Sequence, residues 1–584
     1  MKQLGILDSA FINLEQANTP QHVGGMGIYD PSTAPGGFVR FKDVIAGFER
    51  RLSSMPLFRT RLVEVPGGID RPYWVKDANF DVEFHLRHIA LPEPGDWRQL
   101  CIQVARLHSR PLDMSRPLWE AYIIEGLDNI PNLPEGCFAI YTKMHHSLVD
   151  GAGGSSFMAV LHDLSPDPSE DDAIDTEPRL VDTDPSAAEL LTRASINTVK
   201  NTARLVGGGL RTGRDLGKYM IDVARDDIPS PDVTAPKTIL NKPVGPHRVF
   251  DAAEFPLEGF KDIKNATEST INDVGLAVVS GALRRYLQAK NELPEEGSLA
   301  TGIPLNMRTR RGVTEENNQV GSAYASLHTD IEDPIELVRA IRESTDAAKK
   351  NSEANPLVDA LMLSGVFAPA ISKSLAGFWS RNELSRHIPL NISTCITNVM
   401  GPDFPLYSAG AKMVDYYALG VLTPGMGLFH AIFSYSGKVT LSVLGDRNIM
   451  PDPEFYHDCL VASYEELYAA ASALQPPKGK NKVAVAAKAK IESPRRKRSS
   501  PAKAPAKSKT KAKSTAKGKS TKKAPAKSKA ARKAPAKRKA VKKAPAKRKT
   551  ATKAKTAARR ASASRPKATR RKTAAGKARP KLRS

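Results

Sequence analysis

Two adjacent histidines, His145 and His146, are followed after three residues by Asp150 and Gly151. An apolar run at 137–141 precedes them and predicts a buried strand, and a helical pattern resumes after a Gly-Gly pair. The histidines therefore lie where a strand runs into a loop, a position at which a rigid scaffold often holds catalytic groups. Because imidazole can take up a proton near neutral pH, the spacing is compatible with a general base, with Asp150 fixing the loop.

Two other interpretations of the pair stay open. An isolated histidine is usually a satisfied core or surface residue, and a short motif is only a hypothesis. A metal site is less favoured, because neighbouring side chains of a strand point to opposite faces. The sequence also has no Cys-x-x-Cys and no His-Glu-x-x-His that would supply further ligands. We therefore expect no metal.

Several segments resemble known families. Residues 145–151 match the HHxxxDG motif of CoA-dependent acyltransferases and of peptide-synthetase condensation domains. Further segments resemble, in order, those of the bacterial wax ester synthase/diacylglycerol acyltransferase family: 7–11 (LDSAF), 21–25 (QHVGG), 117–119 (PLW), 272–273 (ND) and 397–402 (TNVMGP). The last segment departs from the family's SNVPGP at Thr397 and Met400, which leaves the local shape of that loop open. The resemblance covers about residues 1–475.

The resemblance implies a mixed α/β fold similar to chloramphenicol acetyltransferase, with two lobes, a central tunnel and the HHxxxDG loop at its middle. It implies an O-acyltransferase that moves a long-chain acyl group from acyl-CoA to diacylglycerol, with long-chain alcohols as a second acceptor class. His146 would be the general base and His145 would shape the loop. Asp150 would be structural and pair with an arginine, for which Arg308 is a candidate. Acyl-CoA is then a co-substrate, and no cofactor is expected.

The other matching residues are predicted to be structural. Pro117, Leu118 and Trp119 are expected to pack under the site. Asn272 and Asp273 precede a helical pattern at 274–287, so we expect them to cap that helix. The oxyanion donors stay unassigned, since backbone N–H groups or a polar side chain of the second lobe would both serve.

The remaining patterns predict an irregular mixture of helices and strands. Helices are expected at 99–109 and 453–474, strands at 74–85 and 121–124, and a hairpin at 429–443 with a Ser-Gly turn. Strands and helices do not alternate regularly, and there is no Gly-x-Gly-x-x-Gly. Both observations argue against a dinucleotide-binding fold.

The net charge of +25 hides two opposite parts. Of the 87 Lys and Arg, 43 lie in 478–584 beside a single acid, Glu492, so residues 1–477 are strongly acidic. We divide the chain into an N-terminal lobe (1–163), an acidic linker with a basic amphipathic crossover helix (164–236), a C-terminal lobe (237–477) and a basic tail (478–584).

The crossover helix, expected at 188–224, carries Lys and Arg among Leu, Val and Ile. The favoured interpretation is an ordinary surface helix broken near Gly207–Gly209. The alternative is an interfacial helix that rests on anionic lipid.

The tail contains no aromatic residue and repeats Ala-Pro-Ala-Lys. It has too little apolar surface to fold, so we expect disorder similar to the tails of linker histones. Such a charge density favours binding to nucleic acid or anionic membrane, without sequence preference and with strong salt dependence.

The N-terminus reaches an acid, Asp8, before any apolar segment could form, and no run of about 18 apolar residues exists. We expect no signal peptide and no transmembrane helix. Four cysteines without paired spacing fit a reducing compartment. The expected location is the cytoplasm, with peripheral association with the inner membrane or lipid droplets.

Two rival functions remain. The body could be a non-catalytic scaffold that tethers lipid droplets or nucleic acid, although the intact HHxxxDG motif argues against this. It could also be a condensation-type enzyme that uses carrier-bound acyl groups, although the sequence contains no carrier domain.

Overall fold

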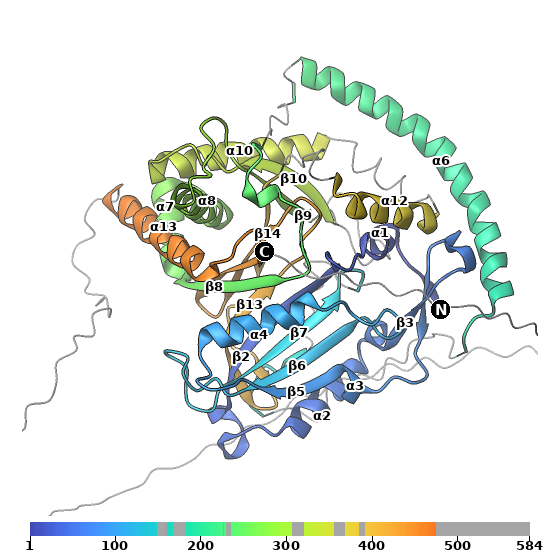
Figure 1. The fold of residues 1–584 in the computed structure, drawn as a ribbon, viewed down its shortest axis with the longest axis horizontal. Coiled ribbons are helices and arrows are strands. Elements are labelled where there is room, and N and C mark those ends of the chain that lie inside the picture. Colours follow the sequence, from blue (N-terminus) through green and yellow to red (C-terminus); the bar gives the residue numbers. More distant parts are fainter. Residues whose placement is uncertain are drawn as a thin grey trace, which may run out of the picture. The chain divides into compact units, whose positions relative to one another are not determined.

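The computed structural model describes residues 1–148, 158, 161–167, 183–225, 227–228, 235–306, 320–354, 368–384 and 392–474. Asp150, Gly151, Arg308, most of the acidic linker and the tail therefore lie outside the described residues. The described part contains two large sheets with helices packed against them (Figure 1).

The first sheet carries the histidine pair. Its strand order is β12-β13-β2-β7-β6-β5, with bounds Tyr407–Ser408, Ala411–Leu419, His22–Asp30, Phe138–His145, Trp119–Glu125 and Leu86–Ala90. The strand predicted before the histidines is β7, which pairs antiparallel with both β2 and β6. Because β12 and β13 come from the second half of the chain, this sheet unites segments that are nearly 400 residues apart.

The second sheet has the order β10-β9-β11-β14-β15-β8, with bounds Val320–Ser326, Ala300–Asn306, Thr394–Met400, Leu428–Tyr435, Lys438–Asp446 and Arg248–Pro256. The strand β11 runs parallel to β9 and β14, and the other pairs are antiparallel. The predicted hairpin is β14–β15. Its turn residues Ser436 and Gly437 both have positive φ (44° and 85°), as a type I′ turn requires.

A third, small sheet has the order β1-β4-β3, with bounds Lys2–Gln3, Tyr73–Lys76 and Thr60–Val63. The strand prediction for 74–85 is correct only at its start. Residues Val82–His85 form a helical turn, α3, because the Asp81 side chain accepts the backbone N–H of Glu83 and starts a helix there.

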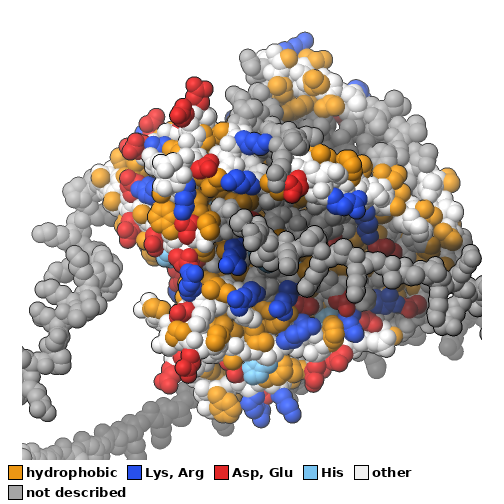
Figure 2. All heavy atoms as spheres, viewed as in Figure 1, with side chains coloured by type: hydrophobic (Ala, Val, Ile, Leu, Met, Phe, Trp, Pro, Cys, Tyr) orange, Lys and Arg blue, Asp and Glu red, His pale blue; other side chains and the backbone are white. Residues whose placement is uncertain are grey.

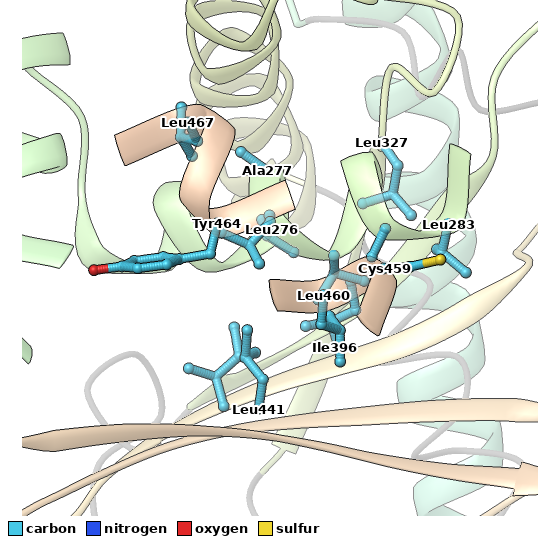
Figure 3. Close-up of a cluster of buried hydrophobic side chains, with 14 of the residues drawn as sticks. Leu276, Ala277, Leu283, Leu327, Ile396, Leu441, Cys459, Leu460, Tyr464 and Leu467 are labelled. Carbon is cyan, nitrogen blue, oxygen red and sulfur yellow. The ribbon is translucent and has the colours of Figure 1, made fainter. Parts of the chain in front are cut away.

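Four helices contribute to the core on one side of the second sheet: α7 (Leu257–Thr267), α8 (Ile271–Ala289), α10 (Pro334–Ala354) and α13 (Pro453–Leu474). Figure 3 shows side chains of α8 and α13 meeting Ile396 of β11 and Leu441 of β15. The helix α8 approaches the sheet closely at Gly275, where a Cβ atom would lie 2.4 Å from the Ile432 side chain. Only glycine allows this contact without a shift of the neighbour.

A shared core joins the two sheets. Tyr122 and Tyr141 of the first sheet cluster with α4 (Trp97–Ser109) and with Phe250 and Phe429 of the second. The indole of Trp97 donates a hydrogen bond to Asp251 of β8 at 2.8 Å. The first sheet and α4 are thus held to the second sheet by apolar packing and by a partly buried hydrogen bond.

Other α-helices of the described residues are α1 (Ile6–Leu14), α2 (Phe41–Leu52), α6 (Ala187–Ala224) and α12 (Pro369–Arg381). The predicted break of α6 near Gly207–Gly209 is wrong, because the helix runs through these glycines. Each glycine costs only about 1 kcal/mol in a helix, and the long flanking turns propagate through them. No helix in the described ranges is both long and apolar enough to cross a bilayer.

Candidate active site

The backbone of both histidines is fixed at the end of β7. The N–H of His145 donates to the carbonyl of Leu118 at 2.9 Å, and the N–H of His146 donates to the carbonyl of Gln21 at 2.8 Å. His145 also stands opposite His22 in the register of β7 and β2. The pair is therefore pinned between the PLW segment on one side and the QHVGG segment on the other.

The ring of His145 is enclosed, with 1% of the residue exposed. Its Nδ1 accepts the backbone N–H of Ser147 at 3.1 Å and lies 2.8 Å from the Ser147 hydroxyl. Because Nδ1 accepts, the proton of the neutral ring is assigned to Nε2. That atom lies 3.5 Å from a carboxylate oxygen of Glu15, which also accepts the N–H of Gln21 at 2.5 Å.

The ring of His146 lies in different surroundings. It is half-buried and stacks on Phe11 of α1, with ring centroids 3.9 Å apart and an interplanar angle of 14°. Thr142 and Ile140, which project from the same side of β7, line a small cavity of about 20 Å³ together with Gly25 of β2. His146 follows the last residue of β7 and is not among the residues that line this cavity.

Tyrosines form much of the cavity wall. A Cβ atom on Gly25 would lie 1.9 Å from the hydroxyl of Tyr416, and one on Gly27 would lie 2.7 Å from that of Tyr29. Tyr29 in turn bonds His162 at 2.6 Å. The glycines of β2 therefore let aromatic rings cross the strand and narrow the space beside it.

Two of the segments that resemble the family, ND at 272–273 and TNVMGP at 397–402, contact each other. The side-chain amide of Asn398 donates to the side-chain carbonyl of Asn272 at 3.4 Å. The neighbouring Val399 packs against the cluster that contains Met144 and Leu148, on either side of the histidines. The first four residues of the TNVMGP segment belong to β11, and Met400 at the end of this strand is 83% exposed. The ND and TNVMGP segments are thus brought toward the histidine segment.

The two residues of the ND segment differ in role. Asp273 closes a capping box: its carboxylate accepts from the backbone and hydroxyl of Thr270, the N-cap of α8, and from Thr345. The expectation that Asn272 also caps the helix is wrong. Asn272 lies in the first turn of α8, and its side chain bonds Asn398 instead.

The PLW segment lies in the core of the first lobe. Leu118 and Trp119 are 0% and 2% exposed. The indole N–H of Trp119 donates to the carbonyl of Phe58 at 2.8 Å, and the ring stacks on His85. This surrounding agrees with a packing role, and the Leu118 carbonyl ties the segment to His145.

A buried cation lies next to His145 on the same face of β7. The ammonium of Lys143 donates to the carbonyls of Leu107 (3.1 Å) and Arg110 (2.8 Å) at the end of α4. It also lies 3.4 Å from the carboxylate of Glu120. Burial lowers the pKa of Lys143, although Glu120 opposes the shift. A cation at the C-terminal end of α4 donates hydrogen bonds to the last carbonyls of the helix and interacts favourably with the helix dipole.

Two further histidines lie deeper on that side. His22 bonds the carbonyl of His108 at 2.6 Å, and His108 bonds the Tyr141 hydroxyl through Nδ1 and the Gly420 carbonyl through Nε2. Burial lowers the pKa of His108 to about 3 and that of His22 well below its usual range. Both rings are neutral and enclosed, which suits them to structure rather than to proton exchange with a substrate.

Sequence reasoning did not assign Phe11, Glu15 or Lys143. Phe11 stands in the LDSAF segment, and Glu15 follows one helical turn later, but nothing in the sequence shows what either contacts. Lys143 does give a signal, because a cation inside an otherwise apolar strand must find partners. Among the described residues no group of three potential ligands could hold a metal ion.

Known proteins match most of the chain. The profile of the wax ester synthase/diacylglycerol acyltransferase catalytic domain matches residues 4–275, and that of the C-terminal domain of this family matches 317–468. A Mycobacterium tuberculosis protein named as a probable diacylglycerol O-acyltransferase is 31% identical over 450 residues, 76% of this chain and 94% of that protein.

Solved structures agree. The wax ester synthase/diacylglycerol acyltransferase from Marinobacter aquaeolei is 27% identical with a TM-score of 0.57, and the match covers 81% of this chain and 100% of that one. The trichothecene 15-O-acetyltransferase of Fusarium sporotrichioides, at 12% identity and a TM-score of 0.50, covers 80% and 94% and shares the fold. The chain therefore belongs to the wax ester synthase/diacylglycerol acyltransferase family and is an acyltransferase.

Proposed function

We propose that this protein transfers a long-chain acyl group from acyl-CoA to the free hydroxyl of diacylglycerol or of a long-chain alcohol. The observation that carries the proposal is the place of His146: a half-buried imidazole directly after the end of β7, where the backbone N–H of His146 is held by the carbonyl of Gln21. The names of the relatives from Mycobacterium and Marinobacter support these acceptors.

In the proposed reaction His146 removes the proton of the acceptor hydroxyl as its oxygen attacks the thioester carbonyl. The new C–O bond gives a tetrahedral intermediate, whose collapse breaks the C–S bond. The imidazolium then returns the proton to the departing CoA thiolate. Such proton transfer contributes about 10²- to 10⁴-fold in rate. The thioester is already activated, so the reaction needs no covalent acyl-enzyme and no cofactor.

The other motif residues are proposed to support this base. His145, held by Ser147 and close to Glu15, sets the conformation of the strand end. Asp150, which Gly151 follows in the motif, is proposed to pair with Arg308. These three residues lie outside the described ranges, so the pair rests on the family resemblance.

Product analysis tests the proposal. The purified protein is incubated with palmitoyl-CoA, diacylglycerol and hexadecanol together, and the lipid products are identified by mass spectrometry. We expect triacylglycerol, wax ester or both, with one free CoA thiol released per ester formed. Thiol release without either ester, or no turnover with any of these acceptors, would overturn the proposal.

The acceptors proposed here are almost insoluble in water, so the enzyme must reach a lipid surface. We propose that α12 makes this contact. Its residues Ile371, Leu375 and Phe378 are 53%, 64% and 55% exposed and lie on one helical face. Figure 2 shows hydrophobic side chains with Lys and Arg beside them over the position of α12. The helix packs on α1, which carries Phe11, so a lipid surface docked there would lie near His146.

The basic tail is proposed to add a second, electrostatic contact. With 43 Lys and Arg and one acid, residues 478–584 would bind nucleic acid or anionic lipid through phosphate charges. The proposal rests on composition alone, because these residues lie outside the described ranges. Its distinguishing property is salt dependence, since release of counterions drives such binding.

Flotation of the full chain with anionic vesicles separates the two contacts. Raising salt from about 50 to 200 mM should weaken the tail's contribution by orders of magnitude, and duplex DNA should compete for it at low salt. The contribution of α12 should persist at high salt and disappear in the variant Leu375→Ser, Phe378→Ser. The control changes Phe38, which is 61% exposed beside α2, to Ser. Salt-resistant binding that survives the α12 variant would contradict the role of this helix.

A further inference from the structure

We propose that α1 is the positioning element of the histidine pair, and that Phe11 and Glu15 are its two positioning residues. They stand four residues apart, one helical turn, and thus project from the same side of the chain. Phe11 contacts the ring of His146, and Glu15 contacts the ring of His145. The inference rests on the proposed function, because it assigns these residues to the orientation of a base at His146.

Glu15 controls the backbone of the pair as well as one ring. Its carboxylate accepts the N–H of Gln21, and the carbonyl of Gln21 accepts the N–H of His146. The same carboxylate faces Nε2 of His145 at 3.5 Å. One side chain therefore links the end of α1, the start of β2 and both histidines.

The place of Glu15 in the helix supports this role. It is the C-cap residue of α1, where the helix dipole disfavours a negative charge by about 0.3–1 kcal/mol. A carboxylate in this position is stabilised only by partners outside the helix. Gln21 and His145 are those partners among the contacts described above.

Phe11 fixes the plane of the other ring. A stack with centroids 3.9 Å apart and nearly parallel planes restricts the tilt of the His146 ring. A base must keep its nitrogen within hydrogen-bond reach of the acceptor hydroxyl, and a displacement of about 1 Å can cost about 100-fold in rate. The flat face of Phe11 is thus suited to hold the imidazole of His146, which lies beyond the last residue of β7.

The helix itself is well anchored. Ile12 of α1 and Leu4, just ahead of the helix, are 3% and 1% exposed in the core of the first lobe, and the N–H of Leu4 donates to the carbonyl of Pro72, the residue before β4. The opposite support comes from α12, which packs along α1. Because α1 is held on two sides, it can transmit a fixed geometry to both rings.

Kinetics of Phe11→Leu and Glu15→Gln test the inference. We expect kcat to fall about 10- to 100-fold in each variant, while KM for acyl-CoA stays within about twofold, because geometry rather than binding is lost. Phe11→Tyr keeps the flat face and should retain most of the wild-type kcat. If Phe11→Leu fails to fold, the kcat of Glu15→Gln still tests the positioning role of α1. Phe11→Tyr still tests whether a flat ring at position 11 is sufficient for activity.

The chain offers matched controls. His88, on β5, stacks on Phe41 (4.9 Å, 15°) and lies 2.9 Å from Glu125, and it is level with Ile140, about 20 Å along β7 from His146. Phe41→Leu and Glu125→Gln remove the same kinds of contact there and should leave kcat unchanged.

The kcat of His146→Ala, compared with the kcat of the α1 variants, distinguishes a failure of this inference from a failure of the proposed function. If His146→Ala retains wild-type kcat, the assigned base is wrong, whatever the α1 variants do. If His146→Ala is inactive but Phe11→Leu and Glu15→Gln keep wild-type kcat, the base stands and the positioning role is overturned. We expect the residual rate of His146→Ala to fall no further when Phe11→Leu is added, because the ring to be positioned is already gone.

Discussion

The variant His146→Ala should lose about 10²- to 10⁴-fold in kcat for ester formation, with the fold intact. The loss follows from removal of the group that we assign to proton transfer. The free energy of unfolding should change by about 1 kcal/mol, because the ring is half-buried and its main packing partner is Phe11. Initial rates of CoA release with diacylglycerol as acceptor, together with urea unfolding, measure the two quantities.

Three variants make this result specific. His146→Gln keeps the size and polarity of the side chain but cannot take up the proton, so it should be as inactive as His146→Ala. His88→Ala, on the edge strand β5, should keep wild-type kcat. His145→Ala should affect folding more than His146→Ala, because His145 is enclosed and tied to Ser147. Full activity of both His146 variants would refute the assignment of the base.

Local patterns predicted the elements around the site well. The apolar run before the histidines is β7, and the Ser-Gly turn joins β14 to β15. The helix expected at 274–287 exists as α8, but it begins earlier, at Ile271 with Thr270 as its N-cap. Each of these depends on residues close together in the sequence. Hydrophobic periodicity, turn conformation and capping are local properties, so a single sequence contains them.

The contacts that position the histidines could not be predicted in the same way. Phe11 and His146 are 135 residues apart, and no periodicity links them. The partnership of Asn272 with Asn398 replaced the expected cap for a similar reason, since a long-range partner decided which way the side chain turns. The addition of β13 to the first sheet is a pairing of strand edges, and sequence patterns give the strands but not their neighbours.

Acid should destabilise this protein more steeply than its carboxylates alone would cause. Burial lowers the pKa of His108 and of His430 to about 3, against an ordinary value of 6.5. In the folded state both rings stay neutral as the pH falls below 6.5, whereas in the unfolded chain they take up protons. The unfolded state therefore binds more protons, and stability is full above about pH 6.5 and declines from there toward pH 3.

At about pH 5.5 each of these two histidines should lower the free energy of unfolding by about 1.4 kcal/mol, or about 3 kcal/mol together. That is a large part of the 5–15 kcal/mol of a typical protein. His22, His85 and His162, whose pKa values burial also lowers, act in the same direction. Urea unfolding followed by tryptophan fluorescence at about pH 7.5 and 5.5 measures the difference, and equal midpoints at the two pH values would contradict the account.

The variant His430→Gln identifies the source of the effect. His430 of β14 bonds the hydroxyls of Thr394 of β11 (3.0 Å) and Tyr456 of α13 (2.7 Å), far in sequence from the histidine pair. Glutamine keeps a polar side chain there but cannot be protonated. The variant should therefore have a lower free energy of unfolding than the wild type at neutral pH. Below pH 6.5, however, its free energy of unfolding should fall less steeply than that of the wild type, by about 1.4 kcal/mol per pH unit. His457→Gln, at a partly exposed site of α13, serves as the control and should keep the wild-type slope.

Because His108 bonds Tyr141 of β7 through the nitrogen that acid would protonate, the same titration weakens the strand that holds His146. Activity should thus be lost on acidification together with the fold of this lobe.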